Sequence, residues 1–118
     1  MYLNDVKLMG SVRDNATLKH LGNGGAILDF ALVTTENFKD HKGEPVERKE
    51  VHRVVAFNAV AKNAASEGLL PAGMEVLVEG FLRSREVKGL LVTEVIARRL
   101  ALTDDVRRKE LRRETRHA

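Results

Sequence analysis

The side chains with the clearest binding chemistry lie in one stretch, Arg48 to Ala65. If its first part is a strand, Val51, Arg53 and Phe57 share one face, because side chains alternate along a strand. A cation among apolar groups suits neither a pure core face nor a pure solvent face. It suits a flat surface that binds a ligand with a charged backbone and apolar faces.

Other kinds of site have little support. The chain has no cysteine, which excludes disulfides, thiolate metal ligands and a cysteine nucleophile. Its four histidines are scattered, so we expect His52 to be packed or at an interface rather than bound to a metal. Asp29, Glu79 and Glu94 could be imagined as nuclease carboxylates, but no spaced acidic set or metal motif accompanies them. We therefore expect no enzyme, no metal and no cofactor.

Length and composition indicate one folded domain with a slight excess of positive charge. The chain has 118 residues, of which 43% are hydrophobic and only two are proline, and this argues against disorder over most of its length. The net charge of +3 gives only weak support for a polyanionic ligand. Residues 1–5 lack a signal-peptide pattern, and no apolar run reaches about 20 residues, so we expect an intracellular protein with no membrane contact.

The hydrophobic pattern predicts five strands and one helix. The strands are expected at residues 3–13, 26–35, 48–57, 74–85 and 90–102, with a short extended piece at 16–21. An alanine-rich run with apolar residues three and four apart predicts the helix at 59–65, before Gly68 and Pro71. Residues 36–47 are expected to form a polar loop that contains Phe38. Glycine-rich turns are expected at 22–25 and at Lys88-Gly89.

This order of elements predicts an all-β fold. Five strands with one helix between the third and fourth fit a small closed barrel, the OB-fold. Gly10 and Gly80 lie inside strands, where they allow bent strands to pass the corners of a barrel. We expect residues 1–102 to form this domain and residues 103–118 to form a basic C-terminal helix or tail, with Thr103 near the helix cap.

Several motifs resemble the bacterial single-stranded DNA-binding protein (SSB) family. They include GEPVERKEVHRVVAF at 43–57 and VLVEGFLRSR at 76–85, and further matches run in order across residues 3–102. The resemblance implies a non-enzymatic OB barrel that coats single-stranded DNA without strong sequence preference in replication, repair or recombination. It also implies a homo-oligomer, usually a tetramer, in the cytoplasm and associated with the nucleoid, where replication or repair proteins are further possible partners.

The resemblance implies roles for individual residues. Arg53 matches a basic position set against phosphate, while Phe57 and Phe38 match positions on which bases stack. Arg83 and Arg85 match a basic pair that leads into the loop between the last two strands. We expect Lys19, Lys62 and Lys88 to add phosphate contacts. His52 matches a position of subunit contact in the family.

Departures from the family pattern leave an alternative open. Val51 stands where a stacking Trp is usual, Val87 replaces another aromatic residue, and the acidic, hydrophobic tip that recruits partners is absent. Asp5 lies where a basic residue is common. The chain could therefore be an SSB-derived protein-interaction subunit, such as a primosomal, phage or plasmid accessory factor, with weak DNA binding. Taken singly, Phe57 could also be plain core, and the basic side chains and the tail could be solvated surface.

Overall fold

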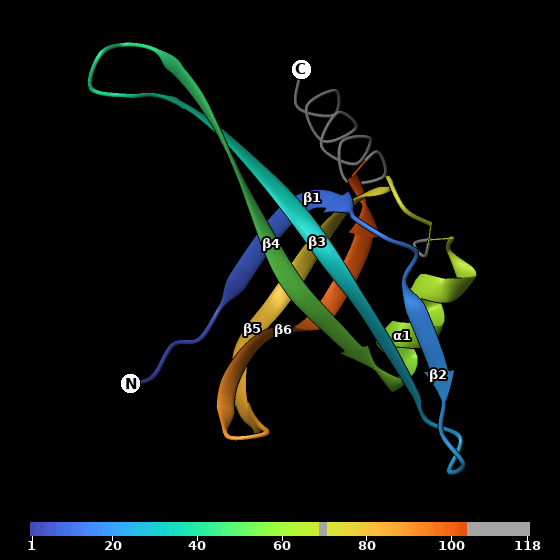
Figure 1. Ribbon diagram of the computed structural model, residues 1–118. Helices are drawn as coiled ribbons and strands as arrows, with labels where there is room; N and C mark the ends of the chain where they lie inside the picture. Colours follow the sequence, from blue (N-terminus) through green and yellow to red (C-terminus); the bar gives the residue numbers. More distant parts are fainter. Residues whose placement is uncertain (69–70, 104–118) are drawn as a thin grey trace.

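The computed structural model describes residues 1–68 and 71–103. Apart from Thr103, the basic tail expected at 103–118 lies outside the described residues. Within residues 1–68 and 71–103, no helix is long and apolar enough to cross a bilayer. The elements, shown in Figure 1, are β1 (Val6–Val12), β2 (Thr17–His20), β3 (Ala26–Lys39), β4 (Pro45–Phe57), α1 (Asn58–Ser66), β5 (Glu75–Val87) and β6 (Leu90–Leu102).

Five of the strands close into a barrel. Their order is β1-β5-β6-β4-β3, and pairing of β1 with β3 at Ser11–Val33 and Val12–Leu32 completes the ring. Strands β4 and β6 are parallel, whereas the other neighbours in the ring are antiparallel. The short β2 is the extended piece expected at 16–21, and it adds to the edge of β3. The predicted five-stranded OB-fold is therefore confirmed, with its helix between β4 and β5.

The barrel interior is formed by alternate residues, as the sequence pattern predicts. Leu28 and Leu32 of β3 are fully buried, as are Val54 and Ala56 of β4, whereas their sequence neighbours point mostly to the outer face. Helix α1 covers one end of this core with the buried Ala61 and Ala64. The helix ends where Gly68 adopts a φ of +76°, a conformation that glycine adopts without steric cost.

Two strand glycines permit the tight curvature. A Cβ at Gly80 would overlap the carbonyl group of Ile96, and the β5–β6 register shifts between Glu79 and Gly80, which marks a bulge. A Cβ at Gly10 would overlap the carbonyl oxygen of Val33, near the point where β1 leaves β5 and pairs with β3. The predicted bend at each glycine is thus explained by close backbone approach.

The prediction of a polar loop at residues 36–47 is wrong. Strands β3 and β4 pair without interruption from Ile27–Phe57 to Lys39–Pro45, so Phe38 lies in a strand. Only residues 40–44 form the turn, in which the Asp40 carboxylate accepts hydrogen bonds from the backbone N–H groups of Lys42 and Glu44, both at 2.9 Å. The two strands form an arm that extends beyond the barrel (Figure 1).

The arm was mistaken for a loop because its side chains carry little hydrophobic signal. Most of its residues are solvent-exposed, and because neither face packs on a core, the sequence shows no alternation of apolar and polar residues there. The ladder depends instead on backbone hydrogen bonds and on cross-strand pairs such as Glu36 opposite Arg48 and Phe38 opposite Val46. Such pairs can be recognised only once the register of the hairpin is known.

Candidate nucleic-acid interface

Four of the predicted binding residues meet on the outer face of the barrel. Arg53 and Phe57 come from β4, and Arg83 and Arg85 come from β5. All four line one open hollow of about 260 Å³. The other residues that line it are Ile27, Asp29, Val55 and Glu94.

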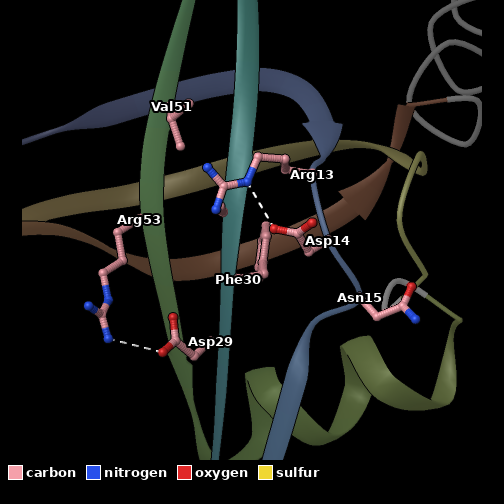
Figure 2. A pocket seen from close by; sticks show the side chains of 8 residues that line it. Arg13, Asp14, Asn15, Asp29, Phe30, Val51 and Arg53 are labelled. Atoms are coloured by element: carbon pink, nitrogen blue, oxygen red, sulfur yellow. Dashed lines mark hydrogen bonds and ion pairs between the residues drawn. The ribbon is translucent and has the colours of Figure 1, made fainter.

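A second hollow lies beside the first and shares Asp29 and Arg53 with it. Its volume is about 470 Å³, and it reaches Val51 on β4 and the β1–β2 connection at Arg13–Asn15. Arg53 of β4 and Asp29 of β3 form an ion pair at 3.1 Å. Figure 2 shows this pair, with Val51 further along β4. The shared pair makes the two hollows neighbours along one path over β3 and β4.

The most buried charged group of this surface is Glu94. Its side chain is 1% exposed, although three guanidinium groups surround its carboxylate. Nε of Arg85 lies 2.6 Å from Oε1, Nε of Arg53 lies 3.1 Å from Oε2, and Nη2 of Arg83 lies 3.8 Å from Oε1. The hydrogen bond from Arg85 lowers the pKa of Glu94 against the opposing effect of burial, and the same bond raises the pKa of Arg85. Both shifts favour the charged forms of Glu94 and Arg85.

Sequence reasoning considered Glu94 only as a nuclease carboxylate and gave it no binding role. A signal was present, because Glu94 lies between the apolar residues Val92 and Ile96 on one face of β6. A lone acid at such a position is buried only when it is paired. The partners were hidden, since they come from strands on both sides of β6.

Phe57 is half-buried and supplies the aromatic surface of the hollow. The guanidinium carbon of Arg83 lies 5.4 Å from the centre of its ring, within the range of a cation–π contact. The ring is therefore held in place while part of it faces the hollow. This position differs from that of a plain core residue, and the stacking role of Phe57 stays a prediction.

The other predicted contact residues do not line either hollow. Phe38 is on the arm under Arg48, at 5.0 Å from the guanidinium carbon to the ring centre. Lys62 on α1 donates a hydrogen bond to the carbonyl of Gly24 at 2.5 Å. Lys88 is exposed in the two-residue β5–β6 turn, whereas Lys19 on β2 pairs with Ile27, which lines the first hollow. Their roles in binding stay predictions.

His52 does not face the hollow. Its Nε2 lies 2.8 Å from the hydroxyl oxygen of Thr34, on the side of the β3–β4 ribbon opposite to Arg53. The ring is half-buried in the single chain. Its role at a subunit interface stays a prediction.

The closed barrel, with one helix between β4 and β5, defines an OB-fold protein, and the hollow on its outer face brings cations and an aromatic ring together. The model of the single-strand binding protein family matches residues 3–112. This chain therefore belongs to the single-strand binding protein family.

Solved structures of similar proteins share the fold. A deletion mutant of the single-stranded DNA binding protein from Thermus aquaticus is 30% identical, with a TM-score of 0.75 over 85% of this chain, which spans 50% of the length of that one. The Plasmodium falciparum SSB, solved in complex with single-stranded DNA, is 25% identical, with a TM-score of 0.74 over 86% of this chain and 96% of that one. A small single-stranded DNA-binding protein from Streptomyces coelicolor, at 22% identity and a TM-score of 0.68 over 86% of this chain and 94% of that one, supports the fold alone.

Proposed function

We propose that this protein binds single-stranded DNA across the outer face of β3, β4, β5 and β6. The observation that carries the proposal is the convergence of Arg53, Arg83, Arg85 and Phe57 on one hollow. Single-strand binding requires cations along the phosphate path and ring faces for the bases, and the hollow offers both. Membership of the family and the DNA-bound Plasmodium falciparum relative support the same ligand.

The net charge of the hollow is small, which limits how much electrostatic attraction of phosphate adds to DNA affinity. Three arginines are opposed by two carboxylates, so one net positive charge remains there. Phosphate contacts alone therefore give modest, salt-sensitive binding, and stacking on Phe57 must add to it. Stacking tolerates any base, which accounts for the low sequence preference that we propose. We also propose that the protein acts as a homo-oligomer in replication, repair or recombination.

The test compares an Arg53→Ala/Phe57→Ala variant with the unaltered chain by fluorescence anisotropy of labelled oligo(dT). Arg99→Ala is the control, because Arg99 is comparably exposed and pairs with Glu79 at 3.4 Å outside the hollow. DNA binding through this face predicts that the double variant loses most of its affinity and that the control keeps it.

A second candidate function gives the opposite outcome. The protein-interaction subunit is favoured by exposed apolar side chains such as Val51, at 54%, and Leu90, at 72%. If the surface mainly serves a protein partner, the unaltered chain binds oligo(dT) weakly and the double variant loses little.

A further inference from the structure

Glu94 occupies the middle of the binding face without being open to it. Strand β6 lies between β5 and β4, so Glu94 faces arginines from both neighbouring strands. Arg83 is its direct cross-strand partner, and Arg85 is the diagonal one, since Arg85 pairs with Val92. Arg53 reaches the same carboxylate from β4. One buried group thus contacts all three cations of the hollow.

Each arginine side chain stays partly exposed, where a ligand can reach it. The side chains of Arg53, Arg83 and Arg85 are 49%, 44% and 45% exposed, although each lies within 4 Å of Glu94. An arginine has five N–H donors in a rigid fork, so one edge can bind a carboxylate while another faces solvent. Arg53 also pairs with Asp29, and Arg83 also lies over the ring of Phe57, yet all three arginines line the hollow with part of their side chains exposed.

We propose that Glu94 is a positioning residue that holds Arg53, Arg83 and Arg85 in the arrangement that binds the phosphates of single-stranded DNA. This inference rests on the proposed function. Ordering a long side chain when a ligand binds costs conformational entropy, and an arginine that is already held does not incur that cost. The buried carboxylate would therefore increase affinity, even though its charge repels phosphate.

Removing the charge of Glu94 changes DNA affinity in one direction if Glu94 positions the arginines and in the other if it only repels phosphate. Asp29 provides the matched comparison, because it also pairs with Arg53, at 3.1 Å, but its side chain is 41% exposed and it contacts one arginine. Simple repulsion predicts that Glu94→Gln and Asp29→Asn both tighten binding. Positioning predicts opposite signs, with Glu94→Gln weakening the affinity for oligo(dT) by about five- to tenfold and Asp29→Asn tightening it by about two- to threefold.

Two further measurements exclude a merely structural role. In an Arg53→Ala/Arg85→Ala background, Glu94→Gln should change affinity by less than about twofold, because only Arg83, whose contact with Glu94 is the longest of the three at 3.8 Å, is left to position. Arg85→Lys keeps the charge and leaves the core untouched, but it loses the fork, and we expect binding about threefold weaker or more. This second variant also tests the proposal if Glu94→Gln fails to fold.

The outcomes distinguish the inference from the proposed function. An unaltered chain that does not bind oligo(dT) at low salt overturns the proposed function and the inference with it. If the unaltered chain binds and folded Glu94→Gln binds as well or better, only the inference is overturned. If Glu94→Gln weakens binding as much in the Arg53→Ala/Arg85→Ala background as in the unaltered chain, or if Arg85→Lys leaves binding unchanged, the inference is also overturned.

Discussion

Substitution of Phe57 by leucine tests how much of the binding comes from an aromatic surface. Leucine keeps an apolar side chain opposite Ile27 but has no ring face for a base. Stacking on one aromatic side chain contributes about 1–3 kcal/mol per base. Because Arg83 already lies 5.4 Å from the ring centre, the ring offers a platform to at most one base. We therefore expect a loss of about 1–2 kcal/mol, which weakens binding by about 5- to 30-fold.

The assay is anisotropy of labelled oligo(dT) at one fixed salt concentration. Urea unfolding provides the control, and Phe57→Leu should lower the free energy of unfolding by less than about 1.5 kcal/mol, because it removes few atoms at a half-buried site. A dissociation constant within twofold of the unaltered chain, measured on a folded variant, would refute the claim that this ring binds a base.

Three further predictions concern stability, pH and salt. Gly80→Ala should lower the free energy of unfolding by about 2–3 kcal/mol, because its Cβ would overlap a carbonyl group of β6, whereas Gly22→Ala, which meets open space, should stay within about 0.5 kcal/mol in urea titrations. The pKa of Glu94 lies below its ordinary value of 4.5 in the folded chain, so its stabilising contribution is present above pH 4.5 and is lost as the pH falls further. In thermal melts, acid should therefore lower the melting temperature of Glu94→Gln by less than that of the unaltered chain. Equal acid sensitivity of the two chains would contradict this. Arg83→Ala should reduce the slope of log affinity against log salt by about 0.7, and an unchanged slope would remove it from the phosphate path.

The barrel could be predicted because its strands have one face in the core. In β3, Leu28, Phe30 and Leu32 alternate with less buried residues, so both the strand and its inward face are visible in the sequence. The arm could not be predicted in the same way, because no core covers residues 36–39 or 45–47. Apolar alternation identifies a strand only where one face is buried, so it does not identify a strand that is solvated on both faces.

The candidate site was predictable only in part for a related reason. Alternation within β4 places Arg53 and Phe57 on the same face, which requires no knowledge of the fold. Their meeting with Arg85 depends on strand order, and the burial of Glu94 depends on the parallel pairing of β4 with β6. These contacts join residues far apart in the chain, so no local pattern contains them.

The central claim is that the outer face of this barrel recognises an unpaired strand. The most direct test is a titration of one labelled oligonucleotide by the unaltered chain, first as a single strand in low salt and then after annealing to its complement. We expect clear binding to the single strand and loss of most of the affinity in the duplex, whose bases are no longer open to stacking. No binding to the single strand, or equal affinity for both forms, would contradict the account.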